Sequence, residues 1–166
     1  MSGFNDVCIC QSSSGISRFW YIDAKFVTNS PDESSNLLNT AALATSAPLN
    51  EIAIEEYTGS YEETEALGEH GAYYDLEINI SNLALDATKD EAALALSGRR
   101  LLVVFKDNNG NYRFIMNARK KQKATTETFV NGKNHYQMSF GRRTRTAAKY
   151  FTGTVTIATD GKLTLS

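Results

Sequence analysis

The sequence contains few of the residues that cross-link small proteins through disulfides or metal ions. Its 166 residues include two cysteines and two histidines. Cys8 and Cys10 would share one face of a strand but lie about two residues apart along it, which is too far for relaxed disulfide geometry. His70 and His135 lack the paired spacing of structural zinc sites. We therefore expect free thiols, no bound metal and no other cofactor.

Long apolar runs are missing as well. No stretch approaches the roughly 18 apolar residues of a membrane-spanning helix, and the first residues, MSGFNDVCICQSSSG, do not resemble a secretory signal. A hydrophobic content of 42% in 166 residues is enough for one ordinary core. These features predict a single β-rich domain, residues 1–166, that folds in a cytoplasm and makes no membrane contact.

Common catalytic motifs do not occur in the chain. We find no G-x-S-x-G elbow, no phosphate-binding G-x-x-x-x-G-K followed by Ser or Thr, and no H-E-x-x-H. The acidic residues between Glu51 and Glu69 invite comparison with the carboxylate pair of a glycosidase, but acids on a strand usually face solvent. The sequence therefore predicts a protein that is not an enzyme.

The charge that is present is divided between the two ends of the chain. Residues 1–98 contain sixteen Asp or Glu against three Lys or Arg, whereas residues 99–166 contain three against fourteen. The overall net charge of −2 hides this polarity. The two halves can pair internally, the basic half can hold an anionic partner, or copies can dock head to tail, acidic face against basic face.

Alternation of β-branched and aromatic residues with polar ones is the dominant pattern and predicts strands. The clearest are Ile16–Val27, Leu49–Tyr57 and Ala72–Ile80. Two hairpins follow, one from Leu101 to Met116 around the turn DNNG and one at the C-terminus around the turn TDGK. One helix is expected over KDEAALALS, with Asp86 or Thr88 as N-cap and Gly98 after its last turn.

These elements predict a mainly β fold, an antiparallel β-sandwich or open barrel of about seven to nine strands with one flanking α-helix. Two segments interrupt the strands. Residues 30–48 are small and polar with a proline near each end, and predict an extended loop, alone or with a short helix that begins near Ser30. Residues 55–70 predict an acidic arm, as a hairpin or an exposed loop.

The charged clusters are the candidate binding residues. The basic run after the first hairpin is interpreted as a solvated loop, as a contact for an acidic protein surface, or as a nucleic-acid site. It has no aromatic residue before Phe129 to stack on bases, which weakens the last interpretation. The basic candidates for a subunit interface are Arg119, Lys120, Lys121, Lys123, Arg142, Arg143 and Arg145. The acidic candidates, for an interface or a lumen, are Glu55, Glu56, Glu62, Glu63, Glu65 and Glu69.

Several segments carry a resemblance to a known class of protein. They are the opening CICQSSSGISRFWYIDAKFV, the Gly98-Arg99-Arg100 that follows the helix, the strand and turn LLVVFKDNNGNYRFI, and the Thr- and Gly-rich terminal strands. Together they resemble small structural proteins of the tail and neck modules of bacteriophages and prophages of gut Bacteroidetes. The resemblance implies a tail-tube-like fold, in a tail-tube or head-to-tail ring protein. The 30–48 insertion and the acidic residues from Glu51 to Glu69 depart from a generic tube protein.

The resemblance implies a structural virion protein of a phage tail or neck, assembled in the bacterial host cytoplasm. Copies would form a ring or tube, contact neighbouring tail or neck proteins, and let DNA pass through a lumen without specific binding. Contacts between unlike surfaces close into rings or continue as filaments, which agrees with the charge polarity. The alternative is a nucleic-acid-binding β-barrel module that uses the basic C-terminal half, with an affinity that falls steeply as salt rises.

Overall fold

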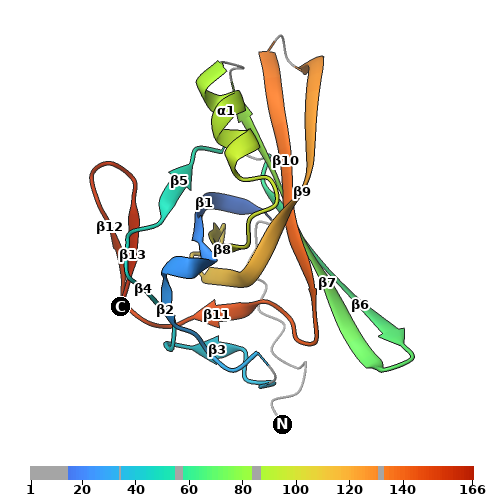
Figure 1. Cartoon of the computed structure of the whole chain (residues 1–166), viewed down its shortest axis with the longest axis vertical. Coiled ribbons are helices and arrows are strands. Elements are labelled where there is room, and N and C mark those ends of the chain that lie inside the picture. Colours follow the sequence, from blue (N-terminus) through green and yellow to red (C-terminus); the bar gives the residue numbers. More distant parts are fainter. Residues whose placement is uncertain (1–14, 34, 55–57, 84–86, 131–132) are drawn as a thin grey trace.

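The computed structural model of the chain describes residues 15–33, 35–54, 58–83, 87–130 and 133–166. For residues 82–83, 87–90, 122–130 and 133–136 it describes the course of the backbone. The described part is mainly β, with one short α-helix beside the sheets (Figure 1). This confirms the predicted fold class.

The main sheet has the strand order β5-β1-β8-β9-β10-β7-β6, and every neighbouring pair in it is antiparallel. Its strands are β1 (Ile16–Asp23), β5 (Asn50–Ile52), β6 (Ser60–Gly68), β7 (Gly71–Leu83), β8 (Leu101–Asp107), β9 (Tyr112–Val130) and β10 (Lys133–Thr144). A further strand, β11 (Lys149–Phe151), pairs with the start of β9 and, in parallel, with β3 (Asn39–Thr40). The basic run after the first hairpin is therefore part of the 19-residue strand β9 and not a loop.

Strand β9 connects two halves of the sheet. Its first part pairs with β8 and its second part with β10, and Asn117 between them has a positive φ of 53°. The halves face each other, since Phe19 on β1 contacts Phe140 on β10 with ring centroids 5.1 Å apart. The described strands thus form an open barrel, in which a single bridge between Ile16 and Gly59 connects β1 to the segment before β6.

Strand β8 lies at the centre of the core because both of its faces are buried. Leu101, Val103 and Phe105 pack into the cluster between the two halves of the sheet, and Leu102 and Val104 pack into a second cluster on the other face. Burial on both faces explains why every position of the run LLVVF is apolar, whereas a strand with one buried face would alternate apolar and polar residues. Every one of these five side chains is at most 1% exposed.

The remaining elements cover the two clusters. The second is covered by the C-terminal hairpin of β12 (Val155–Ile157) and β13 (Leu163–Leu165), and the indole of Trp20 donates a hydrogen bond to the Gly161 carbonyl of its turn. A 3-10 turn η1 (Ala24–Phe26) precedes the pair of β2 (Val27–Asn29) and β4 (Ala44–Thr45). These short strands bring the described number to thirteen, above the seven to nine predicted.

The helix and two long hairpins complete the molecule. Helix α1 (Ala87–Ala95) buries Ala93, and Leu96 just after it, in the first cluster; Gly98 follows with a φ of 75°. The hairpin of β9 and β10 extends past the body beside α1, and the hairpin of β6 and β7 extends on the opposite side (Figure 1). Residues 30–48 contain β3 and β4 and no described helix.

Candidate assembly surface

Much of the charge polarity is neutralised within the chain. Five ion pairs in the described part join an acid of residues 1–98 to a base of residues 99–166. They are Asp23–Arg99, Glu33–Arg142, Glu63–Arg113, Asp75–Arg143 and Glu77–Lys121. The bases that take part in strong pairs are therefore less available to an external anion. A candidate binding surface has to be sought where charge is left exposed.

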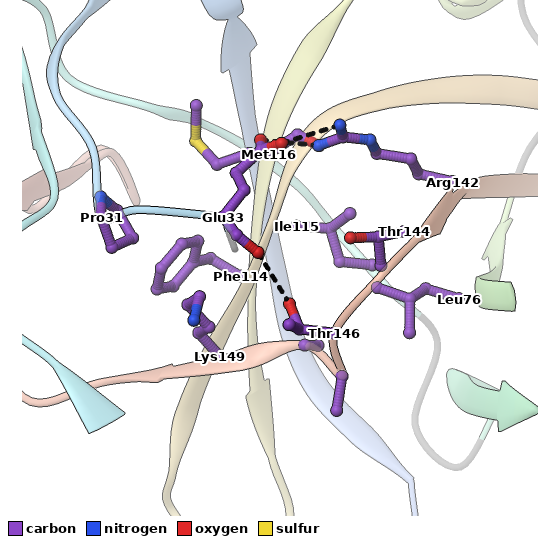
Figure 2. Close-up of a pocket in the computed structure, with 12 residues that line it drawn as sticks. Pro31, Glu33, Leu76, Phe114, Ile115, Met116, Arg142, Thr144, Thr146 and Lys149 are labelled. Atoms are coloured by element: carbon purple, nitrogen blue, oxygen red, sulfur yellow. Dashed lines mark hydrogen bonds and ion pairs between the residues drawn. The ribbon is translucent and has the colours of Figure 1, made fainter. Parts of the chain in front are cut away.

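Arg142 secures the segment that precedes β3. Its guanidinium donates to both carboxylate oxygens of Glu33, at 2.7 and 2.9 Å, and to the Met116 carbonyl at 2.8 Å (Figure 2). The hydrogen bonds from Arg142 hold the pKa of the Glu33 carboxyl below its ordinary value of 4.5. Thr146 adds a hydrogen bond to the Glu33 main-chain carbonyl. Arg142 thus holds the segment around Glu33 against strands β9 and β10.

Lys149 secures the same segment a few residues further on. Its side chain is 6% exposed, and its ammonium donates to the carbonyls of Ser35 and Leu37 at 2.7 and 2.8 Å. A cavity of about 30 Å³ lies beneath the segment, lined in part by Phe114 and Leu76 (Figure 2). Buried ammonium groups are stable only when hydrogen-bonded. We call residues 31–33 and 35–40, held by Arg142, Thr146 and Lys149, the strap.

Two bases of the first basic cluster also have structural partners. Lys120 donates to the Ala93 carbonyl near the end of α1 at 2.5 Å, which ties the helix to β9. Lys121 reaches Glu77 on β7, two strands away, at 3.4 Å. Its side chain crosses Gly141 on the intervening strand β10, so the lack of a side chain at that position makes room for the ion pair.

The other basic candidates differ in exposure. Arg143 binds Asp75 at 3.0 Å and lies over the ring of Tyr73, 4.3 Å from its centroid. Hydrogen bonding to Arg143 lowers the pKa of Asp75. Arg119 and Arg145 are exposed. Lys123 lies in the part of β9 for which the structure describes the backbone, paired with Met138.

Among the acidic candidates, Glu63 has a structural role. Its carboxylate accepts hydrogen bonds from Tyr61, from Arg113 at 3.3 Å and from the Ala148 amide at 3.3 Å. Arg113 is enclosed between the rings of Tyr61 and Tyr150, at 4.6 Å from each centroid. Burial, followed by the hydrogen bond to Glu63, raises the pKa of Tyr61. This group fastens β6 to β9 and β11.

The outer part of the β6–β7 hairpin carries the acids that stay exposed. Glu62, Glu65 and Glu69 are exposed, and the charge of Glu65 raises the pKa of the Tyr74 hydroxyl opposite it. Leu67, paired with Ala72 beside the turn, is 86% exposed. We call residues 64–74 the arm tip. Glu55 and Glu56 lie outside the described residues.

Sequence reasoning did not include Arg99 and Arg100 among the candidates. They directly precede β8, whose first residue, Leu101, pairs with Ala118 on β9. Arg100 is exposed, and Arg99 is 53% exposed with a long 3.7 Å contact to Asp23. The hairpin around DNNG was recognisable in the sequence, and it places Arg99 and Arg100 just before the start of its first strand.

A hollow of about 310 Å³ opens between α1 and strands β1 and β5. Tyr21, Ile52, Ala92, Ala93, Leu96 and Met138 line it, together with Glu51. Arg18 binds the Glu51 carboxylate at 2.7 Å. Burial raises the pKa of Tyr21, and the nearby charge of Arg99 opposes that shift. The described lining is mainly apolar, and its charged residue, Glu51, is paired with Arg18.

Comparison with known proteins assigns no function. No family model matches the chain, and no curated protein matches it. Within the described residues, no group of His, Cys, Asp or Glu is arranged to hold a metal ion. The one helix seen in that part of the chain is too short to cross a membrane.

Proposed function

We propose that this chain is a structural subunit that assembles with its own copies into a ring or tube, in the tail or neck of a bacteriophage virion. Neighbouring tail or neck proteins are its other partners, and DNA passes through the lumen without specific binding. The role requires no catalysis. The protein folds in the host cytoplasm before it is incorporated.

One observation carries the proposal, namely the exposed apolar side chain of Leu67 near the tip of the β6–β7 hairpin, which extends beyond the body. Tyr61 and Ile78, on the same face of the hairpin, pack against the core, whereas Leu67 and Ala72, further along it, are exposed. In the described sheet β6 is also the last strand, so its outer edge has backbone groups free to pair. A projecting hairpin with an exposed leucine and an unpaired strand edge can be completed by pairing with another chain.

The nucleic-acid-binding alternative has less support. Phosphate binding needs several bases free of internal carboxylates. Lys121, Arg142 and Arg143 each bind a carboxylate of the same chain. Fewer bases of the C-terminal half are therefore available to bind phosphate than the sequence alone indicates.

Replacing Leu67 by Ser tests the proposal. We expect sedimentation velocity to show loss of the assembled species, with an unchanged melting temperature, because the side chain has little contact within the monomer. Leu37→Ser is the matched control, since Leu37 is 75% exposed but lies on the strap. Equal assembly of Leu67→Ser and wild type would remove the arm tip from the interface and the proposal's main support.

A further inference from the structure

We propose that Asn109, in the turn between β8 and β9, is a site of spontaneous deamidation, and that its conversion loosens the contact of this turn with the start of β1. The proton of the Gly110 main-chain nitrogen passes to hydroxide, and that nitrogen attacks the side-chain carbonyl carbon of Asn109. A C–N bond forms, and the side-chain nitrogen takes up a proton and leaves as ammonia. Water then opens the cyclic imide at either carbonyl, which gives aspartate or isoaspartate.

The residue that follows Asn109 leaves this attack unhindered. Asparagine is a thermolabile residue, and a side chain on the next residue crowds the attacking nitrogen, whereas glycine has none. Gly110 has a φ of 89°, and the space where its Cβ would lie has no atom within 4 Å. The turn also contains Asn108 and Asn111, which precede Asn109 and Tyr112. Asn109 is therefore the reactive asparagine of this turn.

The side-chain amide of Asn109 is also free to react. Asn109 is exposed, and its side-chain amide has no hydrogen-bond partner within the part of the chain that the structure describes. The amide of Asn111, in contrast, donates to the Asp107 carboxylate at 3.2 Å. The side chain of Asn109 can therefore turn toward the Gly110 nitrogen without losing a contact.

The C-terminal turn provides an internal comparison. Asp160 precedes Gly161 and could form the same cyclic imide, but its carboxylate accepts hydrogen bonds from the Lys162 main-chain amide and ammonium, each at 3.2 Å. These hydrogen bonds lower the pKa of Asp160, and an ionised carboxylate reacts poorly with a nucleophile. The Glu51 carboxylate also crowds Gly161. We therefore expect Asn109 to convert before Asp160.

The hydrogen bonds of the β8–β9 turn control the rate. The Gly110 amide donates to the Asp107 carbonyl at 3.1 Å, so its nitrogen must leave this bond before it attacks. The Asp107 carboxylate holds the turn closed, since it accepts from the main-chain amides of Asn109 and Asn111 at 2.9 and 2.8 Å. Deamidation thus requires local opening of the turn.

The same turn holds the start of β1. The Asn108 amide donates to the Gly15 carbonyl at 3.2 Å, and Ile16 pairs with Asp107. The Ile16 amide donates to the Gly59 carbonyl at 3.1 Å, in the bridge to the segment before β6. Deamidation adds a negative charge close to the Asp107 carboxylate, and isoaspartate also adds a methylene to the backbone. Both changes should loosen the turn and its contact with Gly15.

Incubation of the whole protein in warm, mildly alkaline buffer tests the site, with peptide mapping by mass spectrometry. Asn109 should convert before any other described asparagine and before Asp160, into two products of equal mass. Asp107→Ala should convert several-fold faster, because the turn then opens more often. Asn109→Gln is the matched control, since the longer side chain closes a ring much more slowly. The peptide with Asn131, which also precedes a glycine but lies outside the described residues, is mapped separately.

Two results would overturn the site. One is an intact Asn109 in the protein after a synthetic peptide of residues 106–113 has been fully converted under the same conditions. The other is conversion of Asn108 or Asn111 ahead of Asn109. If Asp107→Ala were no faster than wild type, the hydrogen bonds of the turn would not control the rate.

Hydrogen exchange tests the consequence for the fold. In converted wild-type protein, the amides of Asn108 and Ile16 should exchange several-fold faster than in fresh protein, whereas aged Asn109→Gln should not change. The Leu163 amide, which donates to Leu49 at the C-terminal hairpin, should exchange equally in all samples. Equal exchange at Asn108 and Ile16 before and after conversion would show that deamidation leaves the contact with β1 intact, and would overturn that part of the proposal.

Discussion

The guanidinium of Arg142 holds both carboxylate oxygens of Glu33, although 109 positions separate these residues in the sequence. The pair joins the basic half of the chain to the acidic half and fastens the strap across β9 and β10. Part of the charge segregation in this sequence therefore stabilises the monomer, and we propose that charge left exposed contributes to association.

Glu33→Gln should lower the free energy of unfolding by about 1 kcal/mol at neutral pH, because a partly exposed bidentate ion pair is lost. The folded-state pKa of Glu33 lies below its ordinary value of 4.5, so its contribution is present above that value and disappears as the pH falls through the lowered pKa. Urea unfolding at several pH values measures this. The two proteins should become equally stable in strong acid, and a difference that persists there would contradict the assignment.

Lys149→Met should release the strap, because the carbonyls of Ser35 and Leu37 lose their buried donor. Leaving such groups unsatisfied costs roughly 1–3 kcal/mol. Hydrogen exchange should quicken at the Tyr150 amide, which donates to Leu38 across the strap contact. Lys162→Met on the exposed C-terminal turn serves as the control. Unchanged exchange at Tyr150 would show that Lys149 does not hold the strap.

Gly141→Ala should destabilise the fold by roughly 2–4 kcal/mol, because a Cβ at this position would overlap the main-chain carbonyl of Leu76 and the side chain of Lys121. Thermal unfolding measures the loss. Lys121→Ala in the same background removes only the side-chain overlap. If that second change restored full stability, the contact with the Leu76 backbone would not matter.

Most of the secondary structure could be predicted because it depends on local patterns. The turn at DNNG, the terminal turn at TDGK and the helix before Gly98 are specified by residues a few positions apart. The length of β9 could not be predicted, since its basic second part follows no apolar alternation and forms a strand through pairing with β10. Tertiary contacts outweigh local propensity there.

The candidate site was less predictable, because function in a charged cluster depends on distant partners. Nothing near Arg142 or Arg143 in the sequence indicates that Glu33 and Asp75 bind them. Lys149 gave no signal that it would be buried. Leu67 lies in an acidic segment of the sequence, where nothing indicates whether its side chain is buried. The structure shows that it is exposed near the tip of the hairpin.

Binding to DNA should be weak at physiological salt. The internal pairs of Lys121, Arg142 and Arg143 remove much of the charge that a phosphate backbone would contact. Fluorescence anisotropy of labelled single- and double-stranded DNA at low and physiological salt measures this. Tight binding that falls steeply with salt would favour the nucleic-acid-binding module instead.

The most direct test of self-assembly is the mass of the purified protein in solution, measured by light scattering over a range of protein and salt concentrations, with negative-stain images of the largest species. We expect rings or stacked tubes that grow with protein concentration, and the subunit number would distinguish a tube from a connector ring. A protein that stays monomeric at every concentration, and changes mass only when DNA is added, would contradict it.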